Sequence, residues 1–150
     1  MNKKILVTGG AGYIGSHVVR QLGEAGYDVI VYDNCSTVCA DNILYGELVV
    51  GDLADTELLY NVLSGHQFSA VLHFAASLIV PESVARPLDY YSNNTRNTLN
   101  LLECCNLTGV NKIIFSSTAA VYGEPEKIPV TESTPTQPIN PYGRSKLMSE

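Results

Sequence analysis

Residues 8–15, which read TGGAGYIG, decide the fold that this sequence predicts. A short apolar run, Lys4–Thr8, leads into this segment, and a stretch with apolar residues at helical spacing follows it and closes at Gly26. The glycines satisfy both G-x-G-x-x-G and G-x-x-G-x-x-G. They permit a tight turn, close approach to a pyrophosphate and close packing of a helix on a sheet. Because the N–H groups at the helix start would face the phosphates, the segment predicts a dinucleotide-binding loop between a strand and a helix.

An acidic residue stands where such a loop needs one. Asp33 comes eighteen residues after Gly15, at the end of a second predicted strand, Asp28–Asp33. A carboxylate there can accept hydrogen bonds from an adenosine ribose and repel a 2′-phosphate, and no Lys or Arg follows in residues 34–37, so NAD is favoured over NADP. The plainer alternative is that Asp33 only caps a turn. Asp52, further along, either lies near the adenine or is the N-cap of the helix after it.

Short β-branched runs alternate with amphipathic stretches along the rest of the chain. The pattern predicts strands at residues 47–51, 70–75 and 112–117, and helices at residues 55–63, from about 87 to 108, and from near 142 onward. Near-continuous apolar strands separated by helices imply a parallel sheet covered on both faces. We therefore expect an α/β fold with a doubly wound parallel sheet, a Rossmann-type NAD-binding domain over residues 1–150. A last helix of few turns beside only five strands indicates that this domain is incomplete.

Composition narrows the classes of function. Nine Lys and Arg against 15 Asp and Glu give a formal net charge of −6 over 150 residues. This excludes a strongly basic nucleic-acid surface and a polybasic membrane anchor. No apolar run approaches the roughly 20 residues of a membrane span, and the run after Lys4 is too short for a signal-peptide core. We expect a cytoplasmic protein with no nucleic-acid or membrane partner.

The cysteines and the histidine of the fourth strand favour structural roles. Four cysteines fit reduced thiols in the cytoplasm. Cys35 and Cys39 have the spacing of half a metal site, but no second pair completes it, and Cys104 and Cys105 are neighbours that point in different directions on a helix. We therefore expect no metal. His73 is expected to be a hydrogen-bonded core residue rather than a base.

Tyr142 and Lys146 stand four residues apart in the segment YGRSK, which places them on one face of a helix. Asn140 and Pro141 supply a cap and a first-turn proline for that helix. A phenol is a poor base at neutral pH, but an ammonium group, a positive helix end and an oxidised nicotinamide would all favour its ionised form. The hypothesis is that Tyr142 is an acid–base group. Taken alone, such a pair more often marks a solvated helix surface.

A hydroxyl-rich segment gives this pair its context. Residues 115–123, FSSTAAVYG, leave the fifth strand at its carboxyl end, where ligands bind in open α/β sheets. The hydroxyls there would hydrogen-bond a substrate oxygen. Alternatively, Ser116, Ser117 and Thr118 only satisfy the backbone at a strand end.

With these motifs in this order, the whole chain resembles the N-terminal portion of the extended short-chain dehydrogenase/reductases. Among them it is most similar to the UDP-glucose (UDP-galactose) 4-epimerases. The resemblance implies that the C-terminal substrate domain of the family is absent from this chain. The segments that carry the resemblance, besides the glycine loop, are Tyr32-Asp33-Asn34, Gly51-Asp52, His73-Phe74-Ala75-Ala76, and residues 89–94, 116–123 and 141–146.

The resemblance implies a role for each site residue. Tyr142 would be the base, Lys146 would hold the nicotinamide ribose and Thr118 would be the catalytic hydroxyl. The residues implied to bind NAD are Gly9, Gly12, Tyr13, Ile14, Gly15, Asp33, Asn34, Asp52, Leu53, Phe74, Ala75, Ala76, Asn93, Tyr142 and Lys146. Family epimerases move hydride from sugar C4 to bound NAD, let the 4-keto sugar rotate and return hydride to the other face, so the implied substrate is a UDP-hexose. Many are homodimers through helices resembling residues 87–108 and the helix at Tyr142.

Other functions stay open. A 4,6-dehydratase would carry an Asp-Glu pair after the catalytic Thr, whereas this chain has Ala119-Ala120, which cannot move protons. Leu78 stands where several epimerases have Lys, and Pro81 where Gly is common, so the particular sugar nucleotide is open, as is another epimerase or reductase of this family. An NAD-binding module without catalysis is the alternative from a different class.

Overall fold

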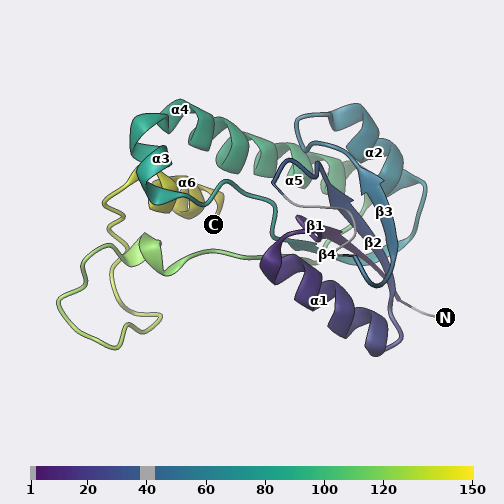
Figure 1. Ribbon diagram of the computed structural model, residues 1–150, viewed down its shortest axis with the longest axis horizontal. Coiled ribbons are helices and arrows are strands. Elements are labelled where there is room, and N and C mark those ends of the chain that lie inside the picture. Colours follow the sequence, from purple (N-terminus) through teal and green to yellow (C-terminus); the bar gives the residue numbers. More distant parts are fainter. Residues whose placement is uncertain (1–2, 38–42) are drawn as a thin grey trace. The chain divides into compact units, whose positions relative to one another are not determined.

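Five parallel strands form the sheet that positions the glycine loop. The computed structural model describes residues 3–37 and 43–150 (Figure 1). Within them the strands follow the order β3-β2-β1-β4-β5, and every pairing is parallel. Their bounds are β1 Lys4–Thr8, β2 Asp28–Asp33, β3 Glu47–Val50, β4 Phe68–His73 and β5 Ile113–Phe115. This order, with β1 between β2 and β4, confirms the predicted doubly wound sheet.

The sheet has an apolar layer on each face, because successive side chains of a strand point to opposite sides. Helix α1, Tyr13–Glu24, covers one face, and α2, Thr56–Ser64, with α5, Asn97–Thr108, covers the other (Figure 1). The strand residues toward α1 are Ile5, Val7, Val29 and Val31, and those toward α2 and α5 are Leu6, Ile30, Tyr32 and Val71. Burial on both faces explains why these strands are almost continuously apolar in sequence.

Glycine ends two of these helices, as the sequence predicts. Gly26 has φ +81°, and the N–H of Tyr27 donates to the carbonyl of Leu22 at 3.0 Å. Gly109 has φ +76°, and the N–H of Val110 donates to the carbonyl of Cys105 at 2.9 Å. Both ends have the hydrogen bond that reaches back over the last turn and satisfies its carbonyl groups.

The predicted single helix over residues 87–108 is interrupted in the structure. It consists of α4, Pro87–Tyr90, a π-helical segment η2, Tyr91–Arg96, and α5. A π-helical turn holds an additional residue, so it changes which side chains face the neighbouring elements. A short helix α3, Val80–Ala85, precedes α4 and was not predicted.

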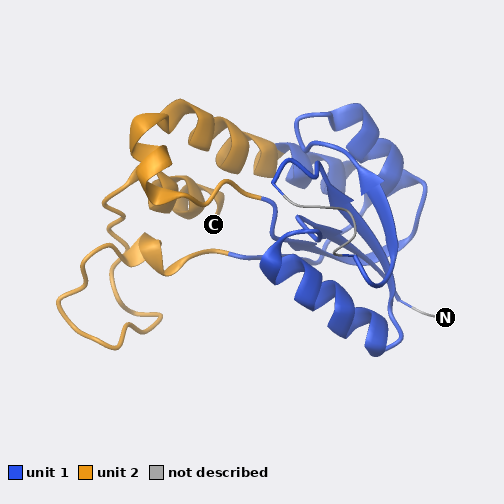
Figure 2. Cartoon of the chain, in the orientation of Figure 1, with its two compact units in different colours: residues 1–75, 100–116 blue, residues 76–99, 117–150 orange. Residues whose placement is uncertain are grey.

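The chain divides into two compact units (Figure 2). Unit 1 consists of Met1–Ala75 and Asn100–Ser116 and holds the sheet, α1 and α2. Unit 2 consists of Ala76–Leu99 and Ser117–Glu150 and holds α3, α4, a 3₁₀ turn η3, Ala119–Tyr122, and α6, Pro141–Ser149. Residues 124–140 form no regular element, as their prolines predict. A single NAD-binding domain over residues 1–150 stays a prediction.

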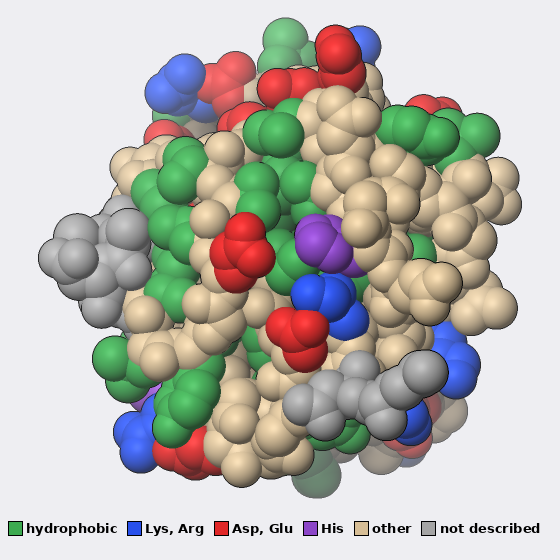
Figure 3. Space-filling model, turned by 90° about the vertical axis from the view of Figure 1, so that its right-hand side faces the viewer, with side chains coloured by type: hydrophobic (Ala, Val, Ile, Leu, Met, Phe, Trp, Pro, Cys, Tyr) green, Lys and Arg blue, Asp and Glu red, His purple; other side chains and the backbone are tan. Residues whose placement is uncertain are grey.

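The face of the molecule drawn in Figure 3 carries side chains of both charges. Acidic and basic side chains are both spread over the face drawn in Figure 3, with apolar side chains between them. Within residues 3–37 and 43–150, none of the helices has the length and hydropathy that crossing a membrane requires.

Candidate functional site

The candidate site residues of unit 1 lie at the glycine loop between β1 and α1. Gly9 has φ +69°, a conformation that side chains with a Cβ rarely adopt. A Cβ there would also lie 2.7 Å from the carbonyl carbon of Phe74 and overlap the backbone nitrogen of Ala75. Glycine therefore allows the segment that follows β4 to lie directly against the loop, with Phe74 N–H donating to the Thr8 carbonyl at 2.9 Å.

The loop presents open backbone at the start of α1. Gly12 is the N-cap, and a Cβ on it would meet only the carbonyl oxygen of Gly9, at 3.3 Å. The N–H of Ser16 donates to the Gly12 carbonyl at 2.8 Å and begins the helical hydrogen bonding, so the preceding N–H groups have no partner within the helix. No acidic side chain stands in this first turn. Accessible N–H groups at a positive helix end suit the pyrophosphate of a dinucleotide.

Asp33 lies at this loop and is 9% exposed. Its Oδ2 accepts a hydrogen bond from Ala11 N–H at 3.0 Å, and its Oδ1 accepts one from Cys35 N–H at 2.9 Å. The alternative that Asp33 caps a turn is therefore correct for part of its role, since both carboxylate oxygens accept backbone N–H groups. Because a carboxylate oxygen can accept two hydrogen bonds, these contacts are compatible with a ribose hydroxyl as a further donor.

Asp52 is not the cap of α2, so that alternative is wrong. The N-cap is Asp55, whose Oδ1 accepts from Leu58 N–H at 3.0 Å. Asp52 instead accepts from Ala54 N–H at 2.8 Å and from the Asn34 side-chain amide at 2.8 Å. The structure therefore brings together two residues implied to bind NAD, Asn34 and Asp52, while Leu53 beside them is buried.

The residues assigned structural roles are buried in unit 1. His73 is 1% exposed, and its Nδ1 lies 2.6 Å from the Thr8 hydroxyl, which confirms a hydrogen-bonded core residue. Cys104 and Cys105 lie on α5 and belong to the core that this helix forms with the sheet, where burial raises the pKa of Cys105 to about 11. Cys39 lies outside the described residues. Among the described ones, no group of three or more His, Cys, Asp or Glu is placed to hold a metal.

The candidate site residues of unit 2 include those at the start of α6. Asn140 is the N-cap, and its Oδ1 accepts from Gly143 N–H at 2.8 Å, with Pro141 in the first turn, as predicted. Tyr142 is half-buried. Lys146 is only 4% exposed, and burial lowers its pKa to about 8. The solvated-surface alternative therefore fails for Lys146.

Thr118 is placed close to this helix start by η3. Its Oγ1 accepts from Ala120 N–H at 3.2 Å and caps η3, so the backbone-satisfying alternative holds in part. The Thr118 hydroxyl only accepts in this hydrogen bond, so its own proton is available to donate to another group. A Cβ on Gly143 would lie 2.6 Å from the carbonyl oxygen of Ala120, so η3 packs on the first turn of α6. Ser117 instead donates to the carboxylate of Glu150.

The π-helical segment adds a residue that the sequence did not single out, Asn94. Its Oδ1 accepts from Ser77 N–H at 2.8 Å, and its Nδ2 donates to the Ser77 carbonyl at 2.9 Å and to the Ser145 hydroxyl at 3.0 Å. The predicted residue Asn93 donates to the Ser77 hydroxyl at 2.9 Å. Asn94 thereby joins the residues after Ala76 to the helix that carries Tyr142. Its sequence signal is its place at the end of residues 89–94, one of the segments that carry the family resemblance.

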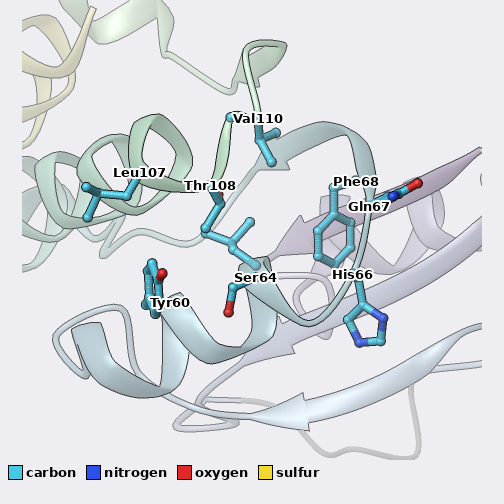
Figure 4. Close-up of a pocket in the computed structure, with 10 residues that line it drawn as sticks. Tyr60, Ser64, His66, Gln67, Phe68, Leu107, Thr108 and Val110 are labelled. Carbon is cyan, nitrogen blue, oxygen red and sulfur yellow. The ribbon is translucent and has the colours of Figure 1, made fainter.

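A pocket of about 420 Å³ lies elsewhere in unit 1 (Figure 4). It is lined by the last turns of α2 and α5 and by Phe68 at the amino end of β4. Phe74 and Ala75 follow the opposite end of that strand, and none of the predicted site residues lines this pocket.

The fold and the loop define a dinucleotide-binding α/β protein, and comparison specifies its family. A model of the family described as GDP-mannose 4,6 dehydratase matches residues 6–150, and the chain belongs to this family. The curated relatives include the UDP-glucose 4-epimerases of Azospirillum brasilense, 54% identical over 98% of this chain and 42% of the relative, and Lactobacillus helveticus, 48% identical over 98% and 45%. The chain spans less than half the length of these relatives.

Solved structures agree with this assignment. The UDP-Glc/GlcNAc 4-epimerase from Campylobacter jejuni is 49% identical with a TM-score of 0.95, over 99% of this chain and 47% of that one. The UDP-glucose 4-epimerase from Brucella ovis in complex with NAD is 45% identical with a TM-score of 0.96, over 98% and 45%. The predicted similarity to the 4-epimerases among the extended short-chain dehydrogenase/reductases is confirmed.

Proposed function

We propose that the protein carrying this chain is an NAD-dependent nucleotide-sugar 4-epimerase that interconverts UDP-galactose and UDP-glucose. The observation that carries the proposal is the burial of Lys146, 4% exposed, one helical turn after the half-buried Tyr142. Burying a cation is costly, so the arrangement favours a functional pair over a surface one. The identity of 54% to the Azospirillum brasilense UDP-glucose 4-epimerase supports the choice of reaction.

The proposed cofactor, NAD, fits the residues of the glycine loop. The open backbone at Gly12 and the N–H groups that begin α1 would hold the pyrophosphate, and Asp33 would accept from the adenosine ribose. Asn34 and Asp52 would lie toward the adenine, while Phe74, Ala75, Ala76 and Asn93 would line the remainder. When bound, NAD would take up and return a hydride at C4 of the sugar.

The acid–base work would fall to this chain's own side chains. Tyr142 would remove the proton of the sugar 4-hydroxyl and later return it. Lys146, held by burial on the same helix, would stabilise the ionised phenol and contact the nicotinamide ribose. Thr118 would donate its hydroxyl proton to the same sugar oxygen. Ala119 and Ala120 in η3 carry no acid or base, which argues against dehydration.

The remaining assignments are part of the same proposal. Residues 1–150 would form most of the NAD-binding domain, in a cytoplasmic homodimer whose subunits meet along residues 87–108 and α6. Leu88 and Leu99 are 79% and 53% exposed. They support an interface along residues 87–108, because large apolar side chains that lie exposed favour a surface that a partner subunit covers.

The test is conversion of UDP-galactose to UDP-glucose by the complete protein that carries this chain, together with its NAD content after denaturation. Tyr142→Phe should lower kcat by about 10²–10⁴-fold while NAD stays bound. Tyr60→Phe, which changes an exposed phenol in the pocket of Figure 4, should leave kcat unchanged. A complete protein that holds NAD but converts no UDP-galactose contradicts the proposal.

A further inference from the structure

Tyr90 is a buried aromatic residue of unit 2 to which the proposed function assigns no role. It ends α4 and is 2% exposed. Its ring lies edge-to-face against the ring of Tyr142, with centroids 6.5 Å apart and planes at 85°. This is one of the preferred arrangements of two aromatic rings. The phenol proposed to do the acid–base work thus has a specific ring packed against it.

The far end of the Tyr90 side chain is anchored at the start of α3. Ile79 N–H donates to the Tyr90 hydroxyl at 3.0 Å, while the Ile79 carbonyl at 2.8 Å and Glu82 Oε2 at 2.9 Å can each accept its proton. One hydroxyl proton serves one of these acceptors at a time. Ile79 is the N-cap of α3, and the Tyr90 oxygen satisfies the backbone N–H of this N-cap residue.

Burial also keeps this anchor in one protonation state. A phenol is protonated at neutral pH, so the Tyr90 hydroxyl is a donor there, and desolvation together with the hydrogen bond to Glu82 raises its pKa further. The hydrogen bonds to Ile79 and Glu82 hold the hydroxyl end of the side chain, so the ring cannot swing away from Tyr142 as a whole without breaking them. Rotation about the second side-chain torsion leaves the oxygen in place, and the close packing of the buried ring limits that rotation instead.

We propose that Tyr90 is a positioning residue that sets the orientation of the Tyr142 ring through edge-to-face packing and through its anchor on α3. This rests on the proposed function, in which the Tyr142 oxygen must meet a sugar hydroxyl. A displacement of about 1 Å at a reacting group can cost about 10²-fold in rate, so the orientation of this ring has a large effect. Tyr90 itself touches no substrate in this proposal.

The kinetic test compares Tyr90→Phe and Tyr90→Leu in the complete protein. Tyr90→Phe keeps the ring and loses the anchor, so kcat for UDP-galactose should fall about 3–10-fold. Tyr90→Leu loses both and should lower kcat by about 10²-fold, with KM changed less than about twofold in either variant. Tyr60→Leu, the same change at an exposed ring, should leave both constants unchanged. Unchanged kcat in Tyr90→Phe, or a rise in KM alone, overturns the proposal even if Tyr90→Leu does not fold.

A spectroscopic test separates this inference from the proposed function. The ¹³C resonances of labelled tyrosine rings report ring packing without turnover, and Tyr142→Phe assigns the Tyr142 signal. That signal should shift in Tyr90→Phe and stay unshifted in Tyr60→Leu. An unshifted Tyr142 resonance overturns the positioning role. An inactive parent enzyme with the expected shift would instead contradict only the epimerase function.

Discussion

The carboxylate of Asp33 accepts a hydrogen bond from the backbone N–H of Ala11 at 3.0 Å, which ties the end of β2 to the glycine loop. The two residues are 22 positions apart, and the contact is buried. The acid that the sequence motif assigns to ribose recognition therefore also shapes the loop that would hold the pyrophosphate. Substitution at Asp33 should change both the loop and the affinity for NAD.

Asp33→Asn should weaken NAD binding about 10-fold, because it removes the charge and replaces one acceptor oxygen by a donor that faces a backbone N–H. The preference for NAD over NADP should shrink as well, since the carboxylate no longer repels a 2′-phosphate. Titration calorimetry with each nucleotide measures both effects. Glu24→Gln, which changes an exposed carboxylate paired with Arg20, is the control. An unaltered NAD affinity in Asp33→Asn would remove Asp33 from the proposed site.

Gly9→Ala should destabilise the fold by at least about 2 kcal/mol, because a positive φ is strained for alanine and the new Cβ meets the backbone at Phe74 and Ala75. Gly26→Ala is the matched control. Its φ is also positive, +81°, but no atom lies within 4 Å of the added Cβ, so it should cost only about 1 kcal/mol. Urea unfolding of both variants measures the difference. Equal losses would mean that the contact with Ala75 contributes nothing.

Lys146→Met should stabilise the fold near pH 7, by about 3 kcal/mol at most, and this gain should disappear with rising pH. Burial lowers the pKa of Lys146 from 10.5 to about 8, so between those values the unfolded chain binds more protons than the folded one. The stability of the parent therefore rises through that interval relative to Lys146→Met. Urea unfolding at pH 7, 9 and 10.5 tests this, with Lys112→Met at an exposed lysine as the control. A difference that stays constant with pH would show that Lys146 is not desolvated.

Asn140→Ala should cost about 1 kcal/mol of stability, because the N–H of Gly143 loses the side-chain cap of α6. Asn140→Ser preserves a capping oxygen and should recover most of the loss. Because the cap lies two residues before Tyr142, kcat of the complete protein should fall in Asn140→Ala and recover in Asn140→Ser. Thermal unfolding and kcat, measured on the same preparations, should change together. If Asn140→Ser recovers stability but not kcat, the cap of α6 does not act on catalysis in the way predicted.

Most of the fold could be predicted from local patterns in the sequence. The bounds of β1 and β2 agree with the apolar runs, and Gly26 and Gly109 mark the ends of α1 and α5. The start of α6 follows from Asn140 and Pro141. These features depend on neighbours within a few residues along the chain, so the residues that produce them are adjacent in sequence.

The misplaced features depend on contacts between distant residues. The interruption of the helix at η2 accompanies the hydrogen bonds of Asn94 to Ser77 and Ser145, which lie 17 and 51 positions away. Helix α3 begins at Val80, and the Tyr90 hydroxyl, eleven positions after Ile79, accepts the backbone N–H of that N-cap residue. Propensity within a window of residues contains no information about such partners.

The order of amino acids by itself determined the alternating strands and helices, the glycine loop, the acid at its side and the Tyr142–Lys146 pair. Tertiary structure alone decided that Lys146 is buried and that Tyr90 lies against Tyr142. The physical reason is that periodicity and capping act over a few residues, whereas desolvation and ring packing depend on which distant segments fold against one another.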